Sequence, residues 1–394
     1  MNYELYHPAL QCRLNCDPGY ESELPPIITC VDGNYEPNRP EEFVCQKTVA
    51  LIVTKAGEME VFSDNRKCNR VMGNIPPMTL GGHTVNLLDN YLVITESREV
   101  NNGWWYSSLS NARQGLLANS WTESPKTLGN DAPVGHLSFV YGKDLFFLGG
   151  EKNTQGVLQN GREENGEWNA VKLTKEEDGS IFDQQIQESC IVRGKKGTFF
   201  VLGGKVNGQI TSNIYKINMK EQNVKEVGSL TKPRAQHACA VLPGSASNES
   251  SIAVLVTGGT SDKDGYGYGY GMGMGMDELF ELDNSKGRSR LLDQPMNVPR
   301  MNHRMVTLGD SIFALGGQRN ADDDSTLETI EKFNPDSESW TVHSTKLLSK
   351  STNGLAVTEL PLSAVSCNQG CKCGHNRSGA KIVGGEDAEV RLPF

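Results

Sequence analysis

The sequence of 394 residues predicts an all-β fold, a β-propeller, and three observations carry this prediction. Short apolar runs end in a pair of glycines, and the first glycines of successive pairs are 54, 55 and 58 residues apart. Another short strand precedes each run, and a polar loop with one or two alternating strands follows it. Four short strands in a period of about 50 residues are typical of a propeller blade.

The glycine pairs that mark the repeat are Gly149-Gly150, Gly203-Gly204, Gly258-Gly259 and Gly316-Gly317. Glycine at the end of a buried strand lets a neighbouring backbone approach and permits angles that a β-carbon forbids. Tyr91–Thr95 and Ala50–Thr54 are further copies of the run without the glycines, which predicts six blades, with seven as the alternative. We expect the strand within 354–360 to complete the N-terminal blade, which would remove exposed edges.

The repeats resemble kelch repeats. The residues that carry this resemblance are the glycine pairs, the segment Val298–His303 before the last copy, and Phe333 seven residues before Trp340. The resemblance covers about residues 48–360 and implies a kelch-type propeller whose inter-strand loops bind a protein or glycan partner. The sequence holds no Gly-x-Ser-x-Gly elbow and no phosphate-cradling loop, so we expect a binding platform without a cofactor.

Histidines open the first strand of several copies, at His83, His136, His237 and His303. Because they recur with the repeat, we expect a structural role and no metal ligation. Cys190 and Cys239 fall in the first strands of neighbouring copies. Strands of adjacent blades generally lie too far apart for a bridge, so we expect two free buried thiols.

Seven of the ten cysteines cluster near the ends of the chain, which suits disulfides in an oxidising compartment better than zinc knuckles. The N-terminal cluster, with its Cys-Asp-Pro-Gly-Tyr segment, resembles the second half of a sushi (complement control) module over residues 1–46. The family pairing implies the disulfides Cys12–Cys30 and Cys16–Cys45. The pairing of Cys68, Cys190, Cys239, Cys367 and Cys371 stays open.

The C-terminal sequence Lys381-Ile382-Val383-Gly384-Gly385 resembles the activation junction of a trypsin-like serine protease zymogen. In that family, cleavage after the basic residue frees an amino terminus that pairs with a buried carboxylate. The resemblance makes 361–381 a cysteine-rich linker and activation peptide, with Cys373 as a tether to the catalytic domain. It makes 382–394 the start of a protease domain that stops before the triad, so we expect no activity from this chain.

The net charge and the glycosylation sequons limit which partners and which compartment we expect. A formal charge of −10 with scattered Lys and Arg argues against nucleic acid, and no apolar run approaches the length of a membrane span. Asn248 and Asn376 lie in N-glycosylation sequons. Met1 is not followed by a signal peptide, so we expect a secreted protein with a truncated start, with a cytoplasmic protein as the alternative.

Together these patterns predict the non-catalytic, partner-binding pro-region of a secreted mosaic serine protease zymogen, activated by a trypsin-like protease at Lys381–Ile382. The alternative is an intracellular kelch scaffold or adaptor that binds actin or a substrate and has no relation to proteases.

Overall fold

A computed structural model describes the greater part of the chain and is nearly all β-strand. The described residues are 9–15, 20–22, 27–31, 34–36, 45–64, 70–74, 83–88, 91–95, 104–109, 121–123, 136–142, 144–150, 156–159, 167–194, 197–243, 245, 251–261, 275–283, 286–320, 326–347, 354–361, 381–384 and 388–391. Across these residues, no helix has the length and apolar character needed to cross a membrane.

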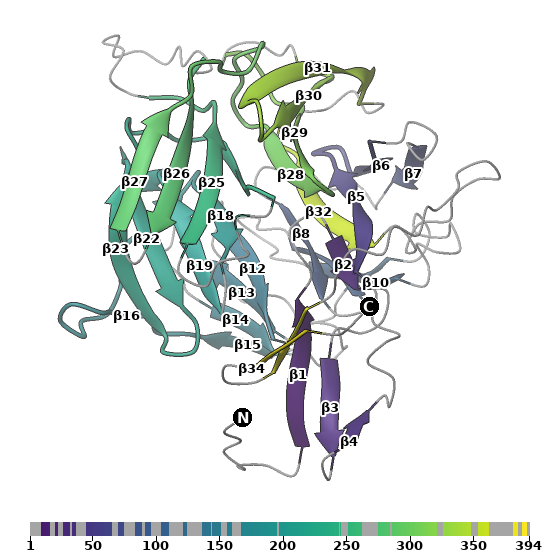
Figure 1. Ribbon diagram of the computed structural model, residues 1–394, viewed down its shortest axis with the longest axis vertical. Coiled ribbons are helices and arrows are strands. Elements are labelled where there is room, and N and C mark those ends of the chain that lie inside the picture. Colours follow the sequence, from purple (N-terminus) through teal and green to yellow (C-terminus); the bar gives the residue numbers. More distant parts are fainter. Residues whose placement is uncertain are drawn as a thin grey trace.

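Antiparallel sheets follow one another along the chain, and each begins with a strand from the predicted first position of the repeat (Figure 1). The first two are β8 (Thr84–Leu88), β9 (Tyr91–Thr95), β10 (Trp104–Ser108) and β11 (Thr122–Glu123), then β12 (Leu137–Tyr141), β13 (Asp144–Leu148), β14 (Gly156–Gln159) and β15 (Glu167–Ala170). The next is β18 (Cys190–Arg193), β19 (Thr198–Leu202), β22 (Asn213–Asn218) and β23 (Asn223–Ser229), with β16 (Thr174–Lys175) parallel to β23. The last two are β24 (Ala238–Val241), β25 (Ser251–Thr257), β26 (Asp277–Asp283) and β27 (Lys286–Leu291), then β28 (Arg304–Leu308), β29 (Ser311–Leu315), β30 (Thr329–Asn334) and β31 (Ser339–Lys346). A small sheet of β17 (Ile186–Gln187), β20 (Lys205–Val206) and β21 (Gln209–Ile210) lies beside them.

One further sheet combines the two ends of this region. It contains β5 (Cys45–Val53), β6 (Glu58–Phe62) and β7 (Arg70–Asn74), and β2 (Tyr20–Ser22) also pairs with β5. The predicted C-terminal partner is confirmed, because β32 (Ala356–Pro361) pairs antiparallel with β5. The pairing joins Ala356 to Val53 and Pro361 to Thr48. Strands from the beginning and the end of the repeats therefore share one sheet.

The first strands of the sheets lie against one another around a common centre. The contacts run from β8 to β12, β18, β24 and β28, and return through β32 to β8. In Figure 1 these strands gather near the middle of the molecule, and outer strands such as β16, β27 and β31 lie at its periphery. No described sheet closes on itself by hydrogen bonding, so the contacts between sheets are made by side chains and loops.

The hydrophobic core lies between the faces of neighbouring sheets. Phe200 and Leu202 of β19 pack with Val254 and Val256 of β25, and all four side chains are buried. Similar clusters join β13 to β19 and β5 to β29. Each sheet therefore stabilises its two neighbours through apolar burial.

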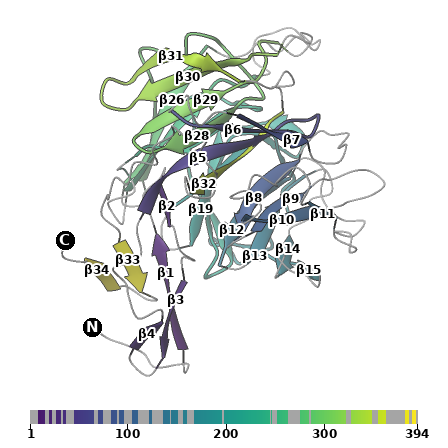
Figure 2. The ribbon, with the colours of Figure 1, turned by 90° about the vertical axis from the view of Figure 1, so that its right-hand side faces the viewer.

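A separate sheet is formed by segments near the two ends of the chain, in the order β34-β33-β1-β3-β4. Its strands are β1 (Ala9–Asn15), β3 (Ile27–Val31), β4 (Asn34–Glu36), β33 (Lys381–Gly384) and β34 (Ala388–Arg391). Figure 2 shows this sheet below the larger body. The side chains of Cys12, Cys30 and Cys45 lie outside the described residues, as do Cys16, Cys68, Cys367, Cys371 and Cys373.

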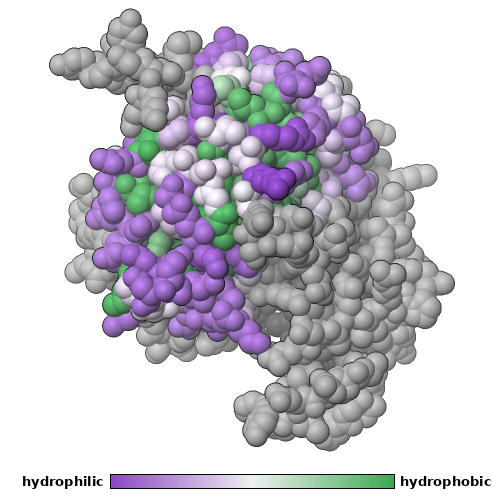
Figure 3. Space-filling model, turned by 60° about the vertical axis from the view of Figure 1, so that its left-hand side comes forward, coloured by the Kyte–Doolittle hydropathy of each residue, from purple (hydrophilic) through white to green (hydrophobic). Residues whose placement is uncertain are grey.

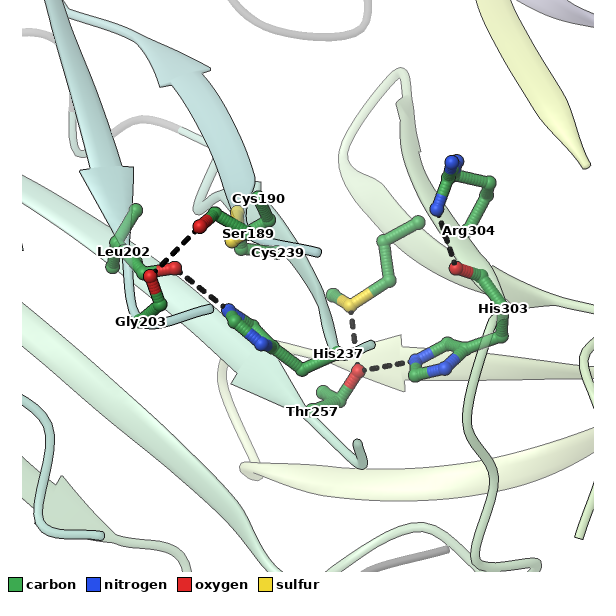
Figure 4. Close-up of a disulfide and its surroundings, with 10 residues drawn as sticks. Ser189, Cys190, Leu202, Gly203, His237, Cys239, Thr257, His303 and Arg304 are labelled. Atoms are coloured by element: carbon green, nitrogen blue, oxygen red, sulfur yellow. Dashed lines mark hydrogen bonds between the residues drawn. A yellow bond between two sulfur atoms is a disulfide. The ribbon is translucent and has the colours of Figure 1, made fainter. Parts of the chain in front are cut away.

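The prediction of two free thiols at Cys190 and Cys239 is wrong. These residues form a disulfide between β18 and β24, with their Cα atoms 5.9 Å apart (Figure 4). That separation lies within the usual range for a bridge. The prediction failed because the first strands of these neighbouring sheets, β18 and β24, lie directly against each other.

Candidate functional site

The glycine pairs lie where the second strand of a sheet ends, and both members of each pair have positive φ, between 55° and 91°. At Gly259 a Cβ atom would lie 2.6 Å from the carbonyl oxygen of Ala235 and 2.8 Å from the Cβ of His237. Side chains rarely adopt this φ, and no Cβ fits at these distances. The pair is therefore required by both conformation and close approach.

Three of the second glycines tie their sheets to the segment that leads into the next sheet. The N–H of Gly204 donates to the carbonyl of Arg234 (2.7 Å), and the N–H of Gly259 donates to the carbonyl of Arg300 (3.0 Å). Gly150 makes the equivalent bond to Ile186 (2.8 Å). These bonds fix where each following sheet begins.

Buried ion pairs also fix these loops, because the residues whose carbonyls accept from Gly204 and Gly259 are arginines with paired side chains. Arg234 pairs with Glu278 at 2.6 Å and Arg300 pairs with Glu331 at 2.7 Å, and all four side chains are 0% exposed. Burial lowers the pKa of Arg300, and the charge of Glu331 counteracts this shift. Burial of such a charge is tolerated only when it is paired and hydrogen-bonded.

The arginine and the glutamate each make further hydrogen bonds. Arg300 Nη1 donates to the carbonyl of Gly316 (2.8 Å), the first glycine of its own sheet. Glu331 accepts from the backbone N–H groups of Asn297 (2.7 Å) and Val298 (3.0 Å). This role of the arginines was not predicted from the sequence, although the pattern Pro-Arg-x-x-His occurs twice, at 233–237 and 299–303.

The predicted histidines connect each sheet to the one before it. In all four, Nε2 is hydrogen-bonded to the last residue of the second strand of the preceding sheet. The bonds run from His83 to Val53, from His136 to Thr95, from His237 to Leu202 and from His303 to Thr257, at 3.0, 3.3, 2.9 and 2.8 Å. Burial lowers the pKa of His83 to about 4 and that of His237 to about 3, so both are neutral at pH 7. Within the described part of the chain, no three metal-ligating side chains come together.

Residues just before the first strands form a chain of backbone hydrogen bonds that passes from sheet to sheet, here called the axial chain. Its members Glu188, Gln236, Asn302 and Gly354 have φ values of 52°, 57°, 54° and 64°. The N–H of Gln236 donates to the carbonyl of Glu188 (2.9 Å), and that of Asn302 donates to Gln236 (2.9 Å). Gly354 donates in turn to Asn302 (3.2 Å). No sequence signal marks these positions because the backbone makes the bonds.

The other predicted residues are placed as follows. Trp340 of β31 is paired in register with Phe333, with the ring centroids 5.1 Å apart. Lys381–Gly384 forms β33, which lies between β1 and β34. Gly385, Cys373, Asn248 and Asn376 lie outside the described residues.

One part of the chain matches a known family model. Residues 299–342 match the Kelch motif, and this segment spans β28 to β31 with Arg300, Gly316-Gly317 and Trp340. No curated protein matches the sequence significantly. The Kelch motif, together with the all-β fold, suggests a protein-binding β-propeller.

We predict that Arg300→Ala lowers the free energy of unfolding by about 3–5 kcal/mol, because it leaves the Glu331 carboxylate buried without its partner. Denaturant unfolding measures the change. The matched control is Arg290→Ala, which removes an ion pair to Glu338 whose side chains are 47% and 41% exposed. Its expected cost is about 0–1 kcal/mol. Equal costs for the two variants would contradict the role of Arg300.

We also predict that Gln236→Gly is more stable than Gln236→Ala by about 1 kcal/mol, because a left-handed backbone strains any residue with a Cβ. Chemical denaturation of both variants tests this order. At Thr341, an exposed position in β31, the order should reverse, because glycine weakens a strand. The same order at both positions would speak against strain at Gln236.

Proposed function

We propose that the sheets between residues 45 and 361 form a six-bladed β-propeller that binds a protein or glycan partner through its inter-strand loops. The match of residues 299–342 to the Kelch motif carries this proposal. Kelch-type repeats build a platform whose loops differ in sequence while the buried contacts repeat. The repeated glycine, histidine and arginine contacts are the buried part of such a platform.

Two observations support six blades over seven. The cycle of first-strand contacts returns from β28 through β32 to β8 and contains six first strands, which favours six blades. The axial chain gives the second. The residues that precede His83 and His136 are Gly82 and Gly135, which lie outside the described residues. Glycine suits the left-handed conformation seen at the other four positions, so the sequence at these two positions is compatible with a repeat of the same kind.

Photo-crosslinking tests the binding role. A photoreactive residue at Arg319, exposed in the loop after Gly316-Gly317, should trap an extracellular protein or glycan partner. The matched control places the same residue at Arg288, which is exposed on the outer strand β27. Crosslinks at position 288 with none at 319 would contradict recognition through the loops.

We further propose that this propeller is the partner-binding pro-region of a secreted trypsin-like zymogen, with Lys381–Ile382 as the activation bond. The sequence Lys381-Ile-Val-Gly-Gly supports the proposal. The Cys190–Cys239 disulfide supports an oxidising compartment and weighs against the intracellular scaffold.

The pairing of β33 bears on how the activation bond is reached. Ile382 lies opposite Leu14 on one side and Val390 on the other, so both edges of the strand are occupied. A protease that binds its substrate as an added strand needs a free edge. Cleavage would therefore require β33 to leave one of its neighbours.

We predict that trypsin cleaves the native protein at Lys381–Ile382 and releases a new amino terminus that begins Ile-Val-Gly-Gly. Mass spectrometry of the fragments identifies the bond. Lys381→Gln should abolish this fragment and leave other cuts unchanged. If Lys381–Ile382 stays intact while other Lys and Arg bonds are cleaved, the junction hypothesis is wrong.

A further inference from the structure

Arg304, the first residue of β28, differs from Arg234 and Arg300, whose side chains are fully buried. Arg234 and Arg300 each pair with a glutamate, whereas no carboxylate among the described residues pairs with Arg304. Its one side-chain hydrogen bond there is a long one of 3.4 Å, from Nη1 to the carbonyl of His303 (Figure 4). The side chain is partly exposed, so its guanidinium retains unused donors that a ligand could reach.

The charge of Arg304 is not compensated by its surroundings. Burial lowers the pKa of Arg304, and no opposite charge in the described part of the chain counteracts that shift. Burial also lowers the pKa of Arg300, but there the charge of Glu331 counteracts the shift. A positive charge held in a partly desolvated position without a counter-ion favours the binding of an anion.

The position of Arg304 is central, because it begins β28, one of the first strands that lie against one another around the common centre. After burial, the charge of Arg304 further lowers the pKa of His83, His237 and His303. These residues precede β8, β24 and β28. No carboxylate counters the shift at any of the three among the described residues. In a protein of net charge −10, the positive charge of Arg304 therefore reaches the inner ends of three sheets without a compensating carboxylate among the described residues.

The outer surface is different in character. Figure 3 shows one face, where hydrophilic residues predominate and hydrophobic ones are scattered among them. The exposed large hydrophobic residues Ile181, Leu291 and Val342 lie on separate elements. A polar or charged ligand therefore fits the described surface better than an apolar one.

We propose that the inner ends of the strands form a binding site for an oxyanion, a carboxylate, phosphate or sulfate group, with the Arg304 guanidinium as its principal ligand. Guanidinium presents paired N–H donors that match the oxygens of these groups. The inference adds a ligand chemistry to the proposed binding role and rests on it only for the arrangement of the blades. It does not depend on the zymogen proposal.

Histidine NMR on the intact protein tests the site without any substitution. Acetate, phosphate and sulfate are titrated separately at constant ionic strength, with chloride as the balancing salt. We expect saturable shifts of the Cε1–H signals of His83, His237 and His303, while that of His343, which contacts Asp64, stays in place. Acetate as the strongest ligand indicates a carboxylate, and phosphate or sulfate indicates a tetrahedral oxyanion. If no signal moves more than in chloride, or all four move together without saturation, the proposal is wrong.

Variants assign the effect to Arg304. Arg304→Gln should weaken the tightest of these ions at least tenfold, and Arg304→Lys should retain part of the affinity. Arg288→Gln, on the exposed face of β27, should leave it unchanged. Unchanged affinity in a folded Arg304→Gln would overturn the assignment. If that variant fails to fold, Arg304→Lys is the deciding variant. Should Arg304→Lys bind acetate, phosphate and sulfate as tightly as the wild-type protein does, a guanidinium site would be contradicted. A loss of affinity here with unchanged crosslinking at Arg319 would separate this site from the proposed partner surface.

Discussion

The left-handed backbone at the inner end of each sheet is the constraint on which the other contacts depend. Gln236 and Asn302 adopt it just before a first strand, and the glycine pairs adopt it just after a second strand. These turns bring the main chains of neighbouring sheets to hydrogen-bonding distance. Only then can His237 reach Leu202 and Arg300 reach Gly316. The side chains secure an arrangement that the backbone first makes possible.

The sequence was informative where the signal is local. Alternating apolar residues and glycine pairs predicted the strands, and the position of 354–360 after the last repeat predicted its pairing with β5. The pairing of Arg300 with Glu331 was not predicted, because the partners are 31 residues apart, one in the loop before β28 and the other in β30. The disulfide between Cys190 and Cys239 was missed because it depends on how closely the sheets converge. Local sequence patterns contain no information on the distance between neighbouring sheets.

The arginines of the inner region differ in whether a carboxylate neutralises their charge. Glu278 and Glu331 neutralise the arginines that lie between loop and sheet, where water is excluded. Arg304, at the start of a first strand, is partly exposed and has no such partner among the described side chains. A sealed position requires an internal counter-ion, whereas a position open to solvent can take its counter-ion from outside. The difference between these arginines therefore separates a structural role from a binding role.

The pairing of β32 with β5 has a consequence for biosynthesis. On the ribosome, β5 is made early, but the strand that completes its sheet emerges only after all the intervening repeats. Until then, the nascent chain carries an unpaired edge that can pair wrongly or recruit a chaperone. Such distant pairing also slows folding, because a long loop must close before the contact forms. The sheet that contains β5 can therefore be completed only after the last repeat has been translated.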